Sequence, residues 1–378
     1  MRPQLHINIF GKRISSFIFL GILGYLLGVL LGIVLAIQLQ MSIRVVWIMS
    51  LISVAMFFLL AYAVKVIFGK ENIVYYHHKI AITISCALVL FLLKQPILPY
   101  LDIMIMGIGT FLIFGRFGCL SVGCCHGTPC KYGIKYGEEH VKKGFTWYYK
   151  NVKLFPVQLV EACVAAAIVT SGVGLLINTV KPGTVLLYYL AAYSLFRFFI
   201  EFFRGDSVRP IWNGVSEAQW TSVALAFVLA IMSYYQWLPI YLWFTITSVI
   251  LLVSLITTII IYHIKSTNRL IDHKHIPEIV EGVLFLSRLP QDIQKNNDQE
   301  NISIYKTSQG MNLSKGMHGN GCFYTISYKK NLKIGVVTRI ARILKVLNKG
   351  YATFSVEKSR NRVYHILFWN EESLTKKV

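Results

Sequence analysis

Long apolar runs, separated by short polar segments, occupy roughly the first two thirds of the chain. Most contain 17 residues or more, the length that a helix needs to cross a hydrocarbon core about 30 Å thick. The run 80–93 is short for a span, and Trp237-Leu238-Pro239 leaves little room for a loop, so seven and eight crossings both fit the pattern. The candidate runs lie near 14–38, 45–68, 80–93, 101–117, 159–177, 184–203, 220–237 and 239–262.

These runs do not alternate apolar and polar positions as membrane strands do. Because a bilayer admits only helices and closed barrels, we predict an all-α polytopic membrane protein with seven or eight transmembrane helices over residues 1–263. The first run follows basic residues, but it is too long for the core of a signal peptide and has no evident small-residue cleavage site. We therefore interpret it as the first span.

The character of the chain changes to charged and polar from about residue 264. We predict a linker over 264–300, since its stretch 291–300 has too few apolar residues to pack. After it, 333–348 carries apolar residues at helical spacing, and several short runs have the composition of strands. These features predict a small soluble α+β domain over 301–378. The strand-like runs are 302–306, 323–328, 352–356 and 363–369.

Composition and charge fit a membrane protein. The chain is 55% apolar and only 15% charged, whereas about a quarter of the residues of a soluble globular protein are charged. The net charge of +21 comes from basic residues in loops and tail, so we expect a phospholipid headgroup, not nucleic acid, as the partner anion. With eight spans, the positive-inside rule predicts that both termini are cytoplasmic and that 69–79, 118–158 and 204–219 share one face.

Four of the seven cysteines fall within twelve positions. The odd total and the crowding argue against a disulfide framework and favour a reactive or metal-binding cluster. With His126 these thiols offer soft ligands for zinc or copper, but the segment lacks the paired C-x2-C spacing of a strong metal site. Small buried side chains are the other interpretation. The clustered residues are Cys119, Cys124, Cys125 and Cys130.

Arginines mark two further candidate sites. Arg116 lies at the start of a glycine-rich stretch, 115–127, where the backbone can approach a ligand and the guanidinium can bind a phosphate with two hydrogen bonds. An arginine that snorkels at a helix end is the structural alternative. An intramembrane arginine–glutamate pair in the sixth run also indicates a functional site, with a purely structural ion pair as the alternative. The residues of this candidate site are Tyr193, Arg197, Glu201 and Arg204, and their spacings of four, four and three predict that they share one helical face.

Four stretches of the chain resemble the prolipoprotein diacylglyceryl transferases of bacteria. The resemblance covers roughly residues 5–225, and the stretches occur in the family's order. The opening segment 6–11, followed by a glycine-spaced span, is also similar to the family's N-terminus. The matching stretches are Gly115-Arg116-x-Gly118 with Gly123 and Gly127, Pro156-x-Gln158-Leu159-x-Glu161, Tyr193-x-x-x-Arg197-x-x-x-Glu201-x-x-Arg204, and Gly214-x-x-x-x-Gln219.

The resemblance implies a multi-pass enzyme of the bacterial cytoplasmic (inner) membrane that acts in lipoprotein biosynthesis, and we expect neither a cofactor nor a bound metal. The family moves a diacylglyceryl group from phosphatidylglycerol to the cysteine thiol of a prolipoprotein and releases glycerol phosphate. Cations must hold the phosphodiester, and a base must make the reactive thiolate. By the resemblance, the anion-binding residues are Arg116 and Arg197, and Tyr193 is a polar catalytic neighbour. Glu201 and Arg204 support them, and Gln158 and Glu161 face the same substrate-binding cavity.

The chain departs from the family pattern at its thiols. Cys119 stands where the family has asparagine, and Cys124 stands where it has glutamate. The family's His-Gly-Gly loop before the third span appears here only as Tyr76-His77-His78-Lys79, without the glycines. These changes remove an amide and an acid from the expected site and put thiols in their place.

The histidines supply the candidate base. We expect His126 to take the proton of the acceptor thiol, with His77 and His78 behind it. Two alternatives stay open. In one, the enzyme keeps the phospholipid donor but modifies a different acceptor peptide, presented by the C-terminal domain. In the other, the scaffold is a thiol- or metal-binding membrane protein without enzymatic activity.

Overall fold

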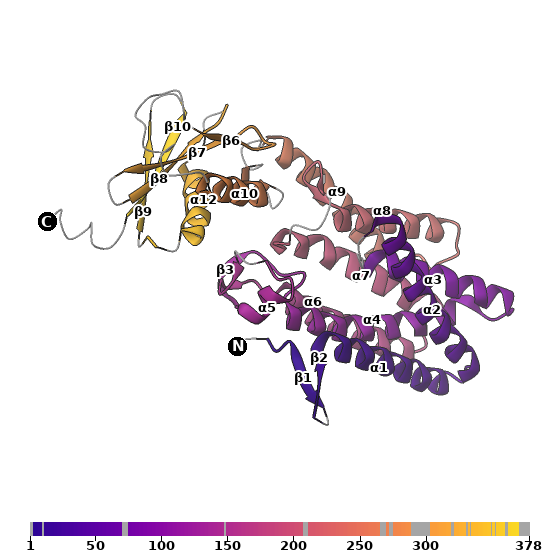
Figure 1. Cartoon of the computed structure of the whole chain (residues 1–378). Helices are drawn as coiled ribbons and strands as arrows, with labels where there is room; N and C mark the ends of the chain where they lie inside the picture. Colours follow the sequence, from indigo (N-terminus) through magenta and orange to yellow (C-terminus); the bar gives the residue numbers. More distant parts are fainter. Residues whose placement is uncertain are drawn as a thin grey trace. The chain divides into compact units, whose positions relative to one another are not determined.

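The chain divides into two compact units, whose elements are labelled on the computed structural model in Figure 1. The first unit is Met1–Ile259 and the second is Ile260–Val378. The structure describes residues 3–9, 11–69, 75–146, 149–206, 211–264, 270–271, 275–288, 303–318, 321–329, 332, 334–348, 350–351, 353–359 and 362–369.

Long helices make up the first unit. Within the described residues, seven helices are long and apolar enough to cross a membrane, which confirms the predicted polytopic class. Helix α8 has 18 residues and is not among those seven. The long helices are α1 (Ser16–Gln38), α2 (Ile43–Phe68), α3 (Tyr75–Leu92), α4 (Ile97–Val122), α6 (Val157–Ile177), α7 (Thr184–Ile200), α8 (Glu217–Tyr234) and α9 (Leu242–Ile264).

The helix boundaries explain the two segments, 80–93 and 237–239, that made the number of membrane crossings ambiguous. The short run 80–93 belongs to α3, which begins earlier, at Tyr75, and so reaches 18 residues. Helix α8 ends at Tyr234 and α9 begins at Leu242, so Trp237-Leu238-Pro239 lies in a turn between two separate helices. Polar residues in the first turn of α3 hide its true length from an apolar-run count.

Short elements connect the long helices. One antiparallel hairpin precedes α1, and a second precedes α8. A strand and a short helix lie between α4 and α6, and α7 ends in a 3-10 turn. These elements are β1 (His6–Ile9), β2 (Lys12–Ser15), β3 (Pro129–Ile134), α5 (Glu138–Lys142), η2 (Glu201–Phe203), β4 (Ile211–Trp212) and β5 (Val215–Ser216).

Glycines let α1 and α4 pack closely. Gly24, Gly28 and Gly32 follow one another at four-residue spacing on α1, and all are buried. A Cβ at Gly28 would lie 2.7 Å from the carbonyl oxygen of Gly107 on α4, which is closer than real Cβ atoms approach. Small residues at this spacing allow helix backbones in a membrane to come together. The contact fixes the position of α4, which carries Arg116 near its end.

A buried carboxylate joins α4 to the start of α7. Asp102 is 2% exposed, and its two oxygens accept hydrogen bonds of 2.6 Å from the backbone N–H groups of Gly183 and Leu186. N–H groups at a helix N-terminus have no partner within the helix, and a carboxylate there also interacts favourably with the helix dipole. Asp102 therefore positions α7, the helix that carries Tyr193 and Arg197.

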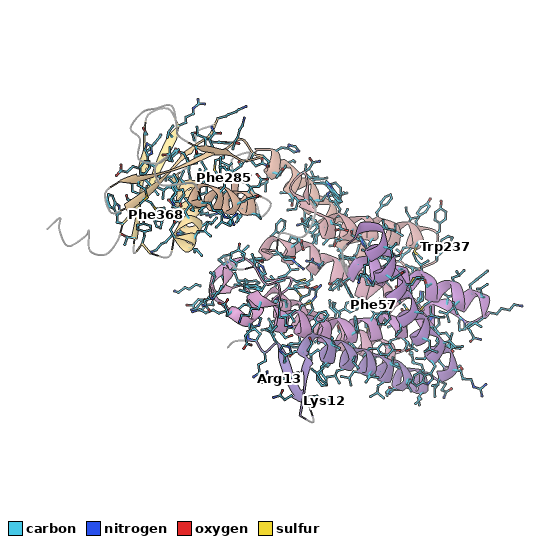
Figure 2. All side chains as sticks on the ribbon, viewed as in Figure 1. Lys12, Arg13, Phe57, Trp237, Phe285 and Phe368 are labelled. Carbon is cyan, nitrogen blue, oxygen red and sulfur yellow. The ribbon has the colours of Figure 1, made fainter. Side chains whose placement is uncertain are left out.

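The second unit is built on a five-stranded antiparallel sheet in the order β6-β7-β8-β10-β9. Helices α10 (His275–Arg288) and α12 (Ile334–Leu347) pack on the sheet and contact each other. Phe368, labelled in Figure 2, lies in the core together with buried residues of both helices. A sheet-containing C-terminal part is thereby confirmed. The strands are β6 (Ile304–Lys306), β7 (Asn312–His318), β8 (Gly321–Ser327), β9 (Thr353–Lys358) and β10 (Val363–Trp369).

Two elements of this unit are absent from the sequence prediction. Helix α10 lies inside the range assigned to a linker, yet its residues Ile279, Val283 and Leu286 are buried in the core. Strand β7 has polar residues and a glycine, and its pairing with β6 on one side and β8 on the other holds it in the sheet. The stretch 291–300 lies outside the described residues, and the boundary at residue 301 stays a prediction.

Replacing Gly28 by leucine should destabilise the first unit, because a side chain there would push α1 away from α4. Overpacking of this kind costs about 1–3 kcal/mol. A Cβ at Gly21 of the same helix meets nothing within 4 Å, so Gly21→Leu is the matched control. We expect the thermal unfolding midpoint of the detergent-solubilised protein to fall for Gly28→Leu only. Equal midpoints for the two variants would contradict the close packing.

Helix α10 should be needed for the C-terminal unit to fold. A fragment 270–378 contains Ile279, Val283 and Leu286, whereas a fragment 301–378 lacks them. Each buried aliphatic side chain contributes about 1.5–3 kcal/mol, so their joint loss is comparable to the whole stability of a small domain, about 5–15 kcal/mol. By circular dichroism in urea, we expect cooperative unfolding of the longer fragment only. A cooperatively folded 301–378 fragment would show that α10 is dispensable.

Candidate functional site

Three helices bring Arg116, Glu161 and Tyr193 together in the interior of the first unit. Arg116 lies near the end of α4, Glu161 near the start of α6 and Tyr193 within α7. Glu161 Oε1 lies 2.8 Å from Arg116 Nη2 and accepts a 2.6 Å hydrogen bond from the Tyr193 hydroxyl. The three residues are 5%, 0% and 0% exposed. The structure thus joins three residues that are far apart in the sequence into one buried group.

Two further arginines lie at the end of α7. Arg197 forms an ion pair with Glu201, which lies one turn further along. At Glu201 the helix tightens into η2, so Arg204 does not continue the α-helical face that the spacing predicts. Its guanidinium instead donates two hydrogen bonds of 2.8 Å to the carboxylate of Asp206. Arg197 and Arg204 are both buried.

The three arginines act together on the Glu161 carboxylate. The charges of Arg116, Arg197 and Arg204 all interact with it electrostatically. Within the described part of the chain, each arginine also has a buried N–H donor without a hydrogen-bond partner: Nε of Arg116, Nη2 of Arg197 and Nη1 of Arg204. Buried donors cost free energy when they lack an acceptor. An anion with several oxygens, such as a phosphodiester, matches this arrangement.

The last turn of α4 and the short loop after it carry Cys119, Cys124 and Cys125. Gly123 ends α4 with a φ of +84°, a conformation that favours glycine. The Gly127 N–H donates to the Phe155 carbonyl oxygen at 3.1 Å, and the Gly205 N–H donates to the His126 carbonyl oxygen at 3.0 Å. A Cβ at Gly127 would lie 2.5 Å from the Phe155 oxygen, so glycine is required there. The loop is therefore tied to the segments before α6 and after α7.

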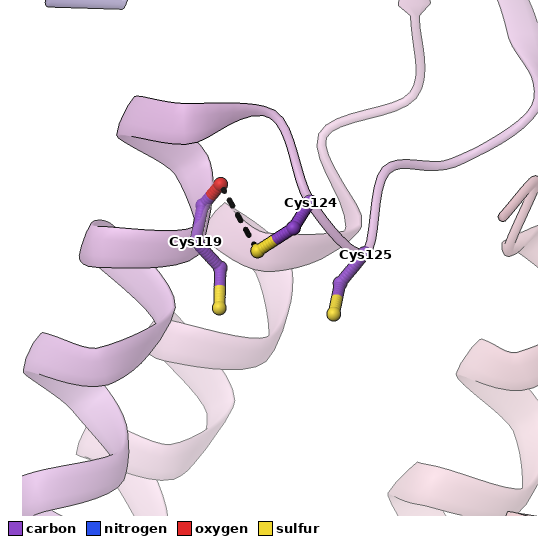
Figure 3. A group of neighbouring side chains, drawn as sticks. All are labelled: Cys119, Cys124 and Cys125. Atoms are coloured by element: carbon purple, nitrogen blue, oxygen red, sulfur yellow. Dashed lines mark hydrogen bonds between the residues drawn. The ribbon is translucent and has the colours of Figure 1, made fainter. Parts of the chain in front are cut away.

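Three of the clustered cysteines bring their sulfur atoms together (Figure 3). The Sγ atoms of Cys119, Cys124 and Cys125 all lie within 4.8 Å of one another. Hydrogen bonds from the Cys119 and Cys124 thiols hold the pKa of Cys125 well below its usual value, and the charges of Arg204 and Arg116 lower it further. The cysteine group therefore favours a thiolate at Cys125, while the Cys124 thiol donates to the carbonyl oxygen of Cys119.

Cys130 and Gln158 take other positions around this loop. Cys130 lies on β3, where its Sγ is 2.6 Å from the carbonyl oxygen of Tyr132, and it is not part of the group of three sulfurs. Gln158 is 1% exposed and donates a 2.6 Å hydrogen bond from Nε2 to the carbonyl oxygen of Cys124. Gln158 thus holds the backbone of the cysteine loop, a role that its sequence motif does not reveal.

His126 lies buried in the same loop. Its Nδ1 is 3.0 Å from the Gly127 carbonyl oxygen, and its ring packs edge-on against Phe145 and Tyr149. Burial lowers the pKa of His126, so its imidazole is neutral at pH 7 and can accept a proton. Its position beside the cysteines and the arginines fits the predicted base.

His77 and His78 both lie in the first turn of α3 but have different neighbours. The side chain of His77 is 49% exposed, and its Nε2 lies 2.9 Å from a carboxylate oxygen of Glu217 on α8. His78 is buried and packs against Phe57, which is labelled in Figure 2. These contacts do not connect either histidine to His126. The two histidines therefore stay predictions as reserve bases.

Lys79 is a buried residue that sequence reasoning counted only as a loop charge. It is 1% exposed, and its Nζ lies over the rings of Tyr76 at 4.5 Å and Tyr193 at 4.8 Å. The ring centroids of Tyr75 and Tyr189 lie 5.6 and 5.8 Å from the same Nζ, and the hydroxyls of these two tyrosines are 2.9 Å apart. Cation–π contacts stabilise such an amine. A helix start at Tyr75 is the signal that would have placed Lys79 inside the bundle.

The fold and this site define a polytopic helical membrane protein with a buried arginine–carboxylate centre. The chain belongs to the prolipoprotein diacylglyceryl transferase family, whose sequence profile matches residues 9–235. This membership confirms the resemblance seen in the motifs. The C-terminal sheet and its helices lie outside the matched range.

Two curated relatives carry the name of this activity. The chain is 30% identical over 118 residues to phosphatidylglycerol–prolipoprotein diacylglyceryl transferase 2 of Clostridium perfringens. It is 29% identical over 110 residues to phosphatidylglycerol–prolipoprotein diacylglyceryl transferase of Clostridium tetani. The alignments cover 30% and 29% of this chain and 43% of each relative, so the chain spans less than half the length of the relatives it matches.

Replacing Glu161 by glutamine should destabilise the protein strongly, because it leaves Arg116 buried without its countercharge. Breaking a buried pair in this way costs about 3–5 kcal/mol. Glu138 pairs with Lys150 at the surface, so Glu138→Gln is the matched control, with an expected cost of about 0–1 kcal/mol. Unfolding in mixed micelles, followed by circular dichroism, measures both. A loss for Glu161→Gln no larger than that of the control would contradict a buried charge pair.

Proposed function

We propose that this protein is a transferase that moves the diacylglyceryl group of phosphatidylglycerol to the cysteine thiol of a prolipoprotein, in the bacterial inner membrane. Family membership and the names of the two clostridial relatives support the proposal. The observation that carries it is the set of buried donors without partners on Arg116, Arg197 and Arg204. A lipid phosphodiester supplies the acceptor oxygens that these donors lack.

The chemistry requires positive charge around the phosphate. The transfer breaks the bond between the glyceryl carbon and the phosphate oxygen and forms a bond between that carbon and sulfur. The departing glycerol phosphate keeps the bonding electrons, so its negative charge grows in the transition state. Preoriented donors in a dry site stabilise such growing charge better than water does. Glu161, held by the Tyr193 hydroxyl, fixes one edge of Arg116 and leaves its Nε for the phosphate.

The acceptor thiol must lose its proton to react. His126 is our candidate for the base, because its imidazole is neutral and because Asp206 and Arg204 interact with its ring electrostatically. The Asp206 carboxylate would stabilise the imidazolium that forms when His126 takes the proton. Tyr193 takes part by orienting Glu161, and Glu201 takes part by pairing with Arg197. These roles divide the site into a phosphate-binding part and a proton-accepting part.

Lysine in place of Arg116 or Arg197 should reduce phosphatidylglycerol binding and transfer, although the charge is kept. Lysine cannot present a planar pair of donors to a phosphate. Loss of one charge-assisted contact in a dry site costs about 2–4 kcal/mol, or roughly thirty- to a thousand-fold in rate. Transfer of a labelled diacylglyceryl group to a peptide with a lipobox cysteine, in nanodiscs that contain phosphatidylglycerol, measures the effect.

Arg44→Lys is the matched control for these variants, because Arg44 is exposed at the start of α2. We expect its binding and transfer to equal those of the unaltered protein. Unchanged lipid binding and transfer in both Arg116→Lys and Arg197→Lys would defeat the proposed function.

A further inference from the structure

Three thiols converge beside the arginine group, and the proposed transfer assigns them no role. The Sγ atoms of Cys119, Cys124 and Cys125 lie within 4.8 Å of one another, as Figure 3 shows, and all three cysteines are free. Cys124 is exposed and the other two are partly exposed, so the group is open to solvent. Thiols that are both clustered and accessible are suited to chemistry more than to packing.

The spacing of the sulfur atoms suits a thiophilic metal ion. Zinc binds cysteine sulfur at about 2.3 Å, which places the sulfurs of a tetrahedral site about 3.8 Å apart. Sulfurs that already lie within 4.8 Å of one another reach this spacing by small side-chain rotations. The loop backbone is held in place by the hydrogen bonds of Gly127 and Gly205, so the ligands are largely preorganised.

Three protein ligands leave a zinc coordination site open. In the part of the chain that the structure describes, the group with metal-ligand spacing consists of these three sulfurs, without a histidine or a carboxylate. Structural zinc sites have four protein ligands, whereas catalytic sites have three and leave the fourth position to water or substrate. The proposed acceptor is itself a thiol, which is a preferred ligand for zinc.

The departures from the family pattern point to the same place. Cys119 and Cys124 are the two positions at which the resemblance leads us to expect other residues, and the structure brings them together with Cys125. Arg204 and Arg116 interact electrostatically with Cys125, so two cations lie near the excess negative charge that several thiolates bring to a divalent ion. The thiols therefore lie next to the phosphate-binding part of the site.

We propose that Cys119, Cys124 and Cys125 bind a zinc ion whose fourth ligand is the sulfur of the acceptor cysteine. This inference rests on the proposed function, because it takes the acceptor to be a thiol. A thiol that coordinates zinc is deprotonated, so the metal holds the acceptor as a thiolate beside the arginines.

The transfer step balances without an oxidant or a reductant. When its sulfur binds the metal, the acceptor thiol passes its proton to His126, the base of the proposed transfer. A sulfur lone pair then attacks the glyceryl carbon of phosphatidylglycerol, and the carbon–oxygen bond breaks as the carbon–sulfur bond forms. Glycerol phosphate leaves with the bonding electrons, and the neutral thioether, a weaker ligand, dissociates from the metal.

The test uses the full chain, purified in detergent under reducing conditions, stripped of metal and reloaded with zinc or cobalt(II). We expect about one zinc ion per chain by elemental mass spectrometry. In the cobalt form, the sulfur-to-cobalt absorption should rise by about one third when a lipobox peptide with a free cysteine is added, since the number of thiolate ligands increases from three to four. A peptide with serine in place of that cysteine should leave the spectrum unchanged.

Variants assign the metal to these ligands. Cys125→Ser and Cys119→Asn each remove one sulfur ligand, and both side chains are only partly buried, so both variants are expected to fold. We expect each to weaken zinc binding by at least about 100-fold. Cys163→Ser is the matched control, because Cys163 is an exposed cysteine of α6 outside the group. Retained phosphatidylglycerol binding in each variant shows that its fold is intact.

Several outcomes would overturn the inference. Zinc content well below one per chain, or zinc binding that survives both Cys125→Ser and Cys119→Asn, excludes the metal site. An unchanged cobalt spectrum with the cysteine peptide excludes the acceptor as a ligand. Full transfer by metal-free protein defeats this inference but leaves the proposed function intact. Zinc and peptide binding without any transfer from phosphatidylglycerol defeats the proposed function and keeps the metal site.

Discussion

A buried charge needs a countercharge beside it, and this requirement fixes how α4, α6 and α7 are arranged around Glu161. Glu161 is fully buried, and it is stabilised because Arg116 and the Tyr193 hydroxyl both bind the same carboxylate oxygen. Because the three partners come from α4, α6 and α7, a shift of any one helix would expose an unpaired charge to a low-dielectric interior. The close packing of α1 on α4 and the Asp102 contact to the start of α7 serve this one geometry.

Physical limits explain what the sequence could reveal. Bilayer thickness imposes long apolar runs, so the spans were predictable, and a charge within such a run is rare enough to draw attention to Arg116 and Arg197. The burial of Lys79 was not predicted, because the apolar run begins after this residue whereas the helix begins before it, at Tyr75. The pairing of Arg204 with Asp206 was not predicted, because the helix tightens at η2 and residue spacing does not reveal this change in backbone geometry.

The C-terminal unit contains two elements that local sequence patterns do not predict. Helix α10 lies inside the range 264–300 that the sequence indicates to be a linker, and only the core of the unit shows why Ile279, Val283 and Leu286 are apolar. Strand β7 has few apolar residues, and hydrogen bonds to strands on both sides hold it in the sheet. In both cases the stabilising partners are distant in sequence, so tertiary contacts decide the local structure.

The backbone hydrogen bonds of Gly127 and Gly205 hold the cysteine loop in place without using any of its side chains. These bonds use main-chain atoms alone, so they tolerate any side chain at positions 119 and 124 that fits the space beside Arg116. An amide or an acid could therefore stand at these two positions without a change in the hydrogen bonds that hold the loop. The main chain thus keeps the loop beside the arginine group whatever chemistry its side chains supply.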